Sequence, residues 1–159
     1  MSATRIVPLT LKVANDFVEQ HHRHSARTSN DGGKFAIGLE LGGKLVGVAI
    51  VGRPVARLLQ QDPGTAEILR VCVAPEAPRN STSRLTARVT RIWQLMGGRK
   101  VVTYTLARES GASMRGCGFE VEGTIDARRW DCPSRPRRAR AIESEDKLRW
   151  GKALDEVPA

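Results

Sequence analysis

The chain has no long hydrophobic run. Its longest apolar stretch, residues 45–51, is far shorter than the roughly 20 residues that a membrane-spanning helix needs. The first eleven residues contain Arg5 and Pro8 and no sustained apolar run, so they do not resemble the hydrophobic region of a secretory signal. We therefore expect a cytoplasmic protein without a membrane partner.

Cysteine and tyrosine are scarce. The three cysteines, Cys72, Cys117 and Cys132, lack the close paired spacing of zinc or redox motifs. Cys72 and Cys117 lie in apolar surroundings that would raise a thiol pKa, so neither is expected to be a nucleophile. Tyr104 is the only tyrosine. These features favour a reducing compartment and a chemistry that does not use a thiolate.

Negative charge is in deficit, because 26 Lys and Arg against 17 Asp and Glu give a formal net charge of +9. Such an excess raises the local concentration of phosphate-bearing ligands and speeds their encounter. Nucleic acid, DNA above all, or an acidic cofactor is therefore a favoured partner, although basic charge can also serve solubility alone. The 159 residues, 40% of them hydrophobic, suffice for one core, and we expect a single domain over residues 1–159.

Hydrophobic periodicity predicts alternating strands and helices. Thr10 can cap a first helix that fades at His21, and Gly42-Gly43 between two apolar runs indicates a β-hairpin. A strand, helix and strand within residues 67–106 predict a parallel pair with a helical crossover. The expected strands cover residues 35–41, 45–51, 67–73, 100–106, 119–123 and 147–154, and later helices cover about 81–96 and 110–115.

Residues 126–141 have a different composition. Arginines accumulate there between Pro133 and Pro136, and such a segment cannot form a packed core, so we expect a loop or arm. Several arginine forks supply salt-dependent affinity for nucleic acid, and Trp130 could stack on a base. The candidate nucleic-acid-binding residues are Arg128, Arg129, Arg135, Arg137, Arg138 and Arg140. A second basic set, Arg84, Arg88 and Arg91, has helical spacing and could equally be a solvated helix face.

A strand, a short loop and the opening of a helix follow one another at residues 67–84. Unpaired N–H groups at a helix start, together with the helix dipole, favour phosphate oxygens. Ser and Thr at such a position can also be plain helix caps. The candidate cofactor-binding residues are Val71, Cys72, Val73, Arg79, Asn80, Ser81, Thr82, Ser83 and Arg84.

The order strand, helix, strand, short helix and Gly118-Phe119 resembles the core of the GNAT acyltransferase superfamily over about residues 35–121. The resemblance implies an α/β fold with a mixed central sheet of about six to seven strands flanked by helices. It also implies acetyl-CoA or another acyl-CoA as cofactor, with its pyrophosphate on the loop that Arg79 begins. Thr82 and Arg84 depart from the pattern, because the family typically has small residues there and side chains crowd the backbone.

Four short segments also resemble the phage Mom-type DNA modification proteins, a GNAT-like branch that modifies adenine in DNA. They are residues 52–57, 70–72, 79–83 and 103–105. This resemblance implies a nucleic-acid base as the acceptor of the transferred group.

The candidate catalytic residues are Tyr104, Arg70, Ser83 and His22. Tyr104 could protonate a leaving thiolate, because the position where the family usually has its acid tyrosine holds Met114; a packed tyrosine with a satisfied hydroxyl is the alternative. Arg70 lies in an apolar strand and needs an anionic or carbonyl partner, either a substrate group or a structural one such as Glu67, Glu40 or Glu109.

The three histidines, His21, His22 and His24, stand at the end of the first predicted helix. His22 could act as a base, and His21 and His24, three residues apart, could share a helical face and bind a metal ion. No third ligand can be assigned, and solvated histidines without chemistry are the alternative. We consider two functions: an acyltransferase-like enzyme acting on a base or another amine, and a non-catalytic nucleic-acid-binding module. The sequence does not decide between a monomer and a homodimer.

Overall fold

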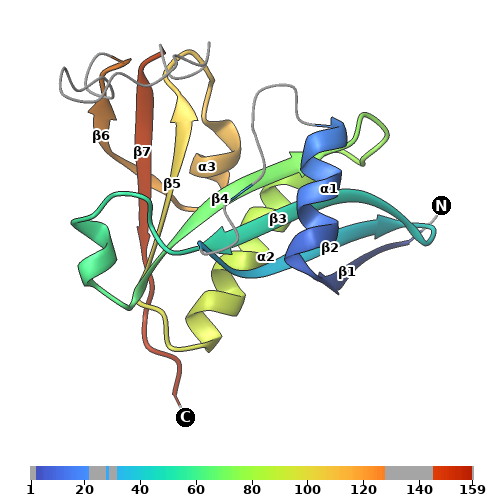
Figure 1. The fold of residues 1–159 in the computed structure, drawn as a ribbon, viewed down its shortest axis with the longest axis horizontal. Helices are drawn as coiled ribbons and strands as arrows, with labels where there is room; N and C mark the ends of the chain where they lie inside the picture. The colour runs from blue at the N-terminus through green and yellow to red at the C-terminus, as the bar shows by residue number, and fades with distance from the viewer. Residues whose placement is uncertain (1–2, 22–27, 29–31, 128–144, 159) are drawn as a thin grey trace.

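The structure is a computed structural model, and it describes all residues except 1–2, 22–27, 29–31, 128–144 and 159. Strands and helices alternate along most of the chain (Figure 1). In chain order the elements are β1 (Thr4–Leu9), α1 (Leu11–His21), β2 (Gly33–Leu41), β3 (Lys44–Gly52), the short 3-10 helix η1 (Leu59–Gln61), β4 (Thr65–Val73), α2 (Ser81–Leu95), β5 (Lys100–Leu106), α3 (Ala112–Gly116), β6 (Glu120–Ile125) and β7 (Lys147–Ala153).

The strands form one mixed sheet of seven in the order β1-β2-β3-β4-β5-β7-β6. Among the strands that the structure describes, β4 and β5 form the one parallel pair, and α2 crosses between them, as the sequence predicted. α1 covers one face of the β2–β4 half of the sheet, and α2 covers the other face (Figure 1). Residues of β3 alternate accordingly: Val48 and Ile50 pack in the α1 cluster, whereas Ala49 and Val51 pack in the α2 cluster. The expected mixed sheet flanked by helices is therefore confirmed.

Local signals placed most elements correctly. The Thr10 hydroxyl accepts the Val13 N–H at 3.2 Å, as expected for a helix cap. Gly42 and Gly43 have φ of 57° and 83°, so the hairpin turn needs the freedom that two glycines give. Asn80 precedes α2 with φ 67°, but its side chain makes no capping hydrogen bond, so it caps α2 by backbone conformation alone.

β1, which pairs with β2 at one edge of the sheet, was not predicted. Pro8 cannot donate to a ladder, and Arg5 is exposed, so the segment has no apolar run. An edge strand tolerates both, because only one side of it is paired. The helix η1 in the β3–β4 loop was not expected either.

β4 and β5 are parallel partners only at their beginnings. The register joins Thr65 to Lys100 and continues to Glu67 and Val102. Just beyond it, the Thr103 hydroxyl donates to the Ile68 carbonyl at 3.1 Å, and then the strands diverge. Figure 1 shows β4 and β5 spreading apart from a common lower end. The fold therefore opens its sheet between two adjacent strands.

The later elements follow the prediction within a few residues, and β7 returns between β5 and β6. Most of the arginine-rich segment 126–141 lies outside the described residues, so its conformation stays a prediction, as does the extent of the single domain. None of the described helices has the length and apolar character required to cross a membrane.

Candidate functional site

A cavity of about 630 Å³ lies where β4 and β5 diverge. That size is typical of sites for small molecules and cofactors. Its walls come from β4, β5 and the segment after it, the β3–β4 loop, α3, the starts of α2 and β7, and the end of β6. The lining residues are Val55, Ala56, Glu67, Ile68, Leu69, Arg70, Val71, Thr82, Thr103, Tyr104, Thr105, Leu106, Glu109, Met114, Ile125 and Lys147.

Glu67 is the last residue of β4 that pairs with β5, and it is only 6% exposed. Its carboxylate accepts the Val55 N–H at 2.8 Å, which fastens the β3–β4 loop to the cavity wall. Burial raises the pKa of Glu67 above its ordinary value, while the Val55 hydrogen bond and the charges of Arg70 and Lys147 act in the opposite direction. A buried carboxylate with a raised pKa is a stronger base than one in water.

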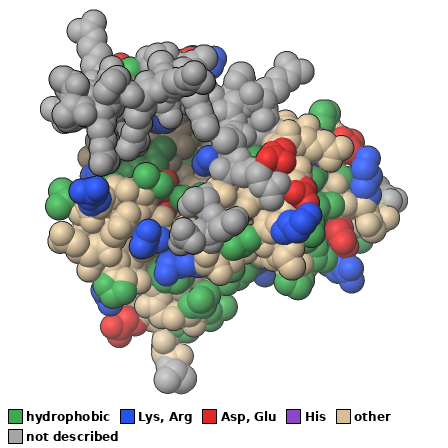
Figure 2. Space-filling view, viewed as in Figure 1, with side chains coloured by type: hydrophobic (Ala, Val, Ile, Leu, Met, Phe, Trp, Pro, Cys, Tyr) green, Lys and Arg blue, Asp and Glu red, His purple; other side chains and the backbone are tan. Residues whose placement is uncertain are grey.

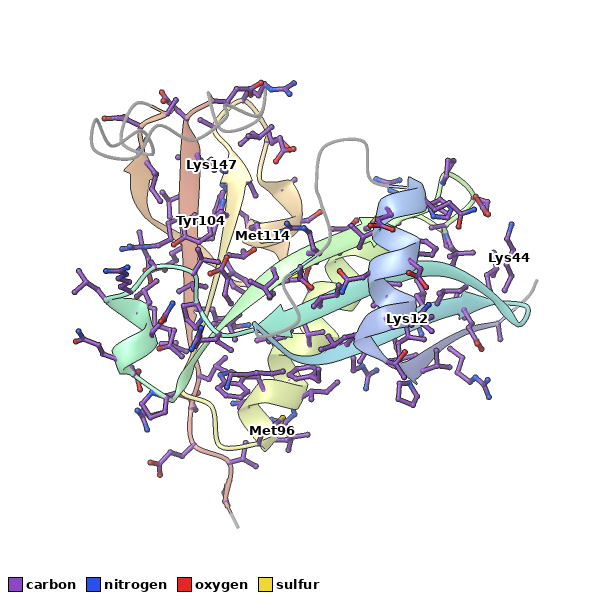
Figure 3. All side chains as sticks on the ribbon, in the orientation of Figure 1. Lys12, Lys44, Met96, Tyr104, Met114 and Lys147 are labelled. Carbon is purple, nitrogen blue, oxygen red and sulfur yellow. The ribbon has the colours of Figure 1, made fainter. Side chains whose placement is uncertain are left out.

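Tyr104 lies two residues beyond the end of the β4–β5 register, is half-buried, and lines the same cavity. Burial raises the pKa of its phenol, and the Glu67 carboxylate raises it further. The Arg149 guanidinium opposes this through its charge and a hydrogen bond. The phenol therefore stays protonated at neutral pH and can donate a proton, as the sequence analysis required. Figure 3 shows Tyr104, Met114 and Lys147 on the side of the cavity formed by β5, α3 and β7.

Arg70 lines the cavity and is half-buried. It donates to the Leu69 carbonyl at 2.6 Å, and its charge lowers the pKa of Glu67. The structural partners that the sequence analysis allowed therefore exist, a carbonyl and Glu67. Because the side chain also faces the cavity, it can hold an anionic group of a ligand as well.

The start of α2 offers unpaired backbone donors. The N–H groups of Thr82 and Ser83 have no hydrogen-bond partner in the part of the chain that the structure describes. Thr82 itself lines the cavity, so these donors are at its edge. Ser81 is different: it is buried, and its hydroxyl donates to the Pro78 carbonyl at 2.5 Å. These two amides, rather than the whole hydroxyl cluster, are the free donors at this end of the helix, and free N–H groups at a helix start are the kind that phosphate oxygens accept from.

The other candidate cofactor residues are arranged unevenly. The Ala74 N–H bonds to β3, and peptide groups alternate along a strand, so those of Val71 and Val73 point toward the opening beside β5. Cys72 is buried in the α1 cluster. Arg79 and Asn80 are exposed, and Arg84 donates to the Thr4 hydroxyl of β1. Arg84 therefore extends toward β1 and does not line the cavity, and only Thr82 stands where bulk could hinder a phosphate.

The remaining candidates lie elsewhere or outside the described residues. His21 stacks on Phe17, with ring centroids 4.1 Å apart, and its Nδ1 lies 3.2 Å from the Phe17 carbonyl oxygen. His22 and His24 are outside the described residues, as are the six arginines from Arg128 to Arg140. Among the described residues, no three His, Cys, Asp or Glu side chains are grouped to hold a metal ion. The metal site stays a prediction.

The thiols behave as the sequence predicted. Burial raises the pKa of both Cys72 and Cys117, although Lys152 partly opposes it at Cys117. A raised pKa leaves little thiolate at neutral pH, so neither is suited to nucleophilic attack.

The sequence pointed to Glu67 and Glu109 only as structural partners of Arg70, and gave Lys147 no part in a site, although all three line the cavity. One signal was available for Glu67: an acidic residue inside an apolar strand, like Arg70, is costly to bury unless it is paired or has a function. Residues 52–57 of the β3–β4 loop carried the resemblance to the Mom-type proteins but not a place at the cavity, because which loop covers the cavity depends on how far β4 and β5 diverge.

No family model matches the chain, and no curated protein matches its sequence. Solved structures match it closely in fold. The ribosomal-protein-S18-alanine N-acetyltransferase of Escherichia coli superposes with a TM-score of 0.70 at 13% identity, over 98% of this chain and 97% of that one. An IAA acetyltransferase from Bacillus cereus gives 0.71 at 16% identity, over 96% and 100%.

A GNAT family acetyltransferase from Elizabethkingia anophelis with acetyl-CoA bound gives a TM-score of 0.64 at 17% identity, over 95% of this chain and 98% of that one. Identities this low establish the fold and nothing finer. The diverging parallel strands, the crossover helix and the near-complete overlap give this chain the fold of the GNAT acetyltransferases.

Proposed function

We propose that this protein is an acyl-CoA-dependent N-acyltransferase that acts on an amine. One observation carries the proposal: the two unpaired amides of α2 stand at the edge of the cavity that Glu67 and Tyr104 also line. A donor for phosphate, a base and an acid are thus present in one space. Several solved proteins of this fold have CoA or acetyl-CoA bound, which supports the choice of cofactor.

The residues present fit such a cofactor. The amides of Thr82 and Ser83 would hold pyrophosphate oxygens, and the peptide groups of Val71 and Val73 would hold the extended arm beside β4. Bound acyl-CoA supplies a thioester whose acyl carbon an amine can attack. The missing glycines of the loop matter less than the sequence suggested, because Arg84 does not line the cavity.

The proton transfers follow from the two titrating groups. The Glu67 carboxylate takes the proton that the amine nitrogen loses as its bond to the acyl carbon forms. The Tyr104 phenol gives its proton to the sulfur as the carbon–sulfur bond breaks. The raised pKa of each group favours its role, because the first makes a stronger base and the second an acid that stays protonated.

For the acceptor we propose an amine carried by a polyanion, in particular a nucleic-acid base, as the resemblance to the Mom-type branch suggests. The net charge of +9 supports this choice. So does the β3–β4 loop, where Val55 and Ala56 line the cavity and the neighbouring Arg53 and Arg57 are exposed. Neither arginine takes part in an ion pair within the described residues. In Figure 2 basic side chains lie over the left of this face, near the loop, whereas acidic and basic side chains adjoin at the right.

The test is to express the protein in cells, digest their DNA and RNA, and weigh the nucleosides. An acyl-mass shift on one base, absent with Tyr104→Phe, is the expected result. Acetyl-CoA at a hundred times its Kd should also stabilise the protein by about 2.7 kcal/mol, whereas adenosine, which lacks the pyrophosphate, should not. Salt-dependent nucleic-acid retention with no covalent product would favour a binding module. Product on a small-molecule or protein amine alone would support the acyltransferase and reject the base.

A further inference from the structure

Tyr104 and Arg149 face each other across two antiparallel strands. The β5–β7 register pairs Tyr104 directly with Arg149, so the two side chains project from the same face of the sheet. Arg149 acts on the phenol by charge and by hydrogen bond. The orientation of the phenol in the cavity therefore depends on where the guanidinium is held.

Glu122 holds that guanidinium from the far side of β7. Its Oε2 lies 3.3 Å from Nε of Arg149, and its Oε1 lies 2.7 Å from Nζ of Lys100 on β5. The Glu122 side chain is only 24% exposed, so solvent screens these charges less than at an open surface. The Nε atom of Arg149 is buried and makes no well-aligned hydrogen bond with a described residue, so the ion pair restrains it.

Two backbone features allow Glu122 to reach across β7. The β6–β7 register shifts between Val121 and Gly123, which places Glu122 at a bulge outside the regular pairing. The strand that it crosses carries Gly151 at the crossing point. A Cβ on Gly151 would lie 1.8 Å from Oε1 of Glu122, so any side chain there would displace the carboxylate. A bulge and a glycine together create the path of the carboxylate.

We propose that Arg149 is a positioning residue for Tyr104, and that Glu122, passing over Gly151, sets the place of Arg149. The inference rests on the proposed function only in taking Tyr104 as the acid of the reaction. It explains why three charged residues, Lys100, Glu122 and Arg149, meet where the Glu122 side chain crosses β7. It also assigns Gly151 a part in the site without any contact with a ligand.

Gly151→Ala tests the proposal without changing a charge. Because Tyr104 is the only tyrosine, the ultraviolet absorbance of its phenolate reports its titration directly. Arg149 affects the phenol more than Glu122 does, so releasing both should raise the pKa of Tyr104. Gly123→Ala is the matched control, since a Cβ there meets nothing within 4 Å. Circular dichroism at each pH verifies that both variants are folded.

Glu122→Ala separates positioning from simple charge. Deleting the carboxylate without moving Arg149 would lower the pKa of Tyr104, because Glu122 by itself raises it. Loss of positioning predicts the opposite, a rise. Adding Gly151→Ala to Glu122→Ala should then have little further effect, since the displaced group is already gone. A fall in the pKa with Glu122→Ala, or an unchanged titration with Gly151→Ala, would overturn the proposal.

Kinetics provide the second readout. We expect Gly151→Ala to lower kcat about tenfold to a hundredfold, as misplacement of a catalytic group does, with the KM for acetyl-CoA unchanged. Gly123→Ala should leave both constants alone. If no acyl transfer exists at all, the proposed function fails while the phenol titration still decides the positioning network. If transfer exists and the titration does not move, only the network fails.

Discussion

The two ends of the β4–β5 pair differ in what they hold together. At the paired end, residues 65–67 of β4 and 101–102 of β5 are buried, and the neighbouring strands and α2 pack against them. At the open end, Leu69, Arg70 and Val71 of β4 and residues 104–106 of β5 are half-buried and line the cavity. The same two strands thus supply stability at one end and ionisable groups at the other.

Glu67 and Thr103 mark the boundary between these ends. Glu67 is the last residue of β4 in the parallel register, and Thr103 makes the final cross-strand hydrogen bond. The buried carboxylate is tolerated there because Val55 donates to it, and Arg70 and Lys147 act on it electrostatically. The proposed catalytic groups therefore start where the backbone pairing of β4 with β5 ends. Substitutions on the two sides of this boundary should affect activity and stability separately.

The largest expected effect comes from the carboxylate at the boundary, Glu67. Glu67→Gln should lower kcat for acetyl transfer about 10²- to 10⁴-fold, because the base is lost while the shape is kept. The measurement is steady-state kinetics with acetyl-CoA and the amine identified by co-expression. Glu76→Gln, at an exposed carboxylate paired with Lys44, is the control and should keep full activity. A fully active Glu67→Gln enzyme would show that another group takes the proton.

The next effect comes from the packed region. Leu85 is fully buried on α2, and its Cδ1 lies about where a Cβ on Gly47 of β3 would touch it. Leu85→Ala should lower the free energy of unfolding by about 2 to 5 kcal/mol, measured by urea denaturation. Leu95→Ala on the same helix, where the side chain is 59% exposed, should cost far less. Similar losses for both would mean that the packing of α2 against β3 contributes little to stability.

The elements that sequence reasoning located share a local cause. The Gly42-Gly43 turn, the α2 stripe of Leu85, Val89 and Trp93, and the parallel β4–β5 unit all follow from short-range pattern. β1 was missed because an edge strand containing Pro8 needs no apolar run. The sequence pattern of the strands also does not show how far β4 and β5 diverge, and this divergence decides which residues line the cavity.

The candidate site was predicted in part for the same reason. Tyr104, Arg70, Val71 and Thr82 line one cavity, as expected of residues near the crossover. Arg84 does not line it, because its guanidinium reaches β1, a strand that the pattern did not reveal. The link from Tyr104 through Arg149 to Glu122 joins three strands and depends on register and a bulge. Neither can be read from one sequence.

A smaller effect is expected at the boundary itself. Thr103→Val keeps the shape of the side chain and removes its hydrogen bond to the Ile68 carbonyl. Leaving a buried acceptor unpaired should cost about 1 to 3 kcal/mol in urea denaturation. Thr124→Val, at an exposed position of β6, is the control and should change little. If Thr103→Val and Thr124→Val had the same free energy of unfolding, the hydrogen bond from Thr103 to Ile68 would contribute nothing to holding β4 and β5 together.

The smallest effect is the pH dependence of stability that Glu67 confers. Its folded-state pKa is raised above 4.5, so between 4.5 and the folded value the native state holds a proton that the unfolded state has lost. Stability from this group is full below 4.5 and declines as the pH rises through the folded pKa. Wild type should therefore lose free energy of unfolding relative to Glu67→Gln across that window, measured by urea denaturation at a series of pH values.

Glu76 gives the opposite sign and so calibrates the experiment. The Lys44 hydrogen bond lowers the pKa of Glu76 below 4.5, so its contribution is present above 4.5 and is lost as the pH falls through the folded value. Relative to Glu76→Gln, wild type should gain stability as the pH rises. The two carboxylates would then respond in opposite directions, because Glu67 is buried where β4 and β5 separate and Glu76 is paired with Lys44 at an exposed site. If stability changed with pH in the same direction for both carboxylates, burial would not raise the pKa of Glu67. The reason to regard Glu67 as the base would then be lost.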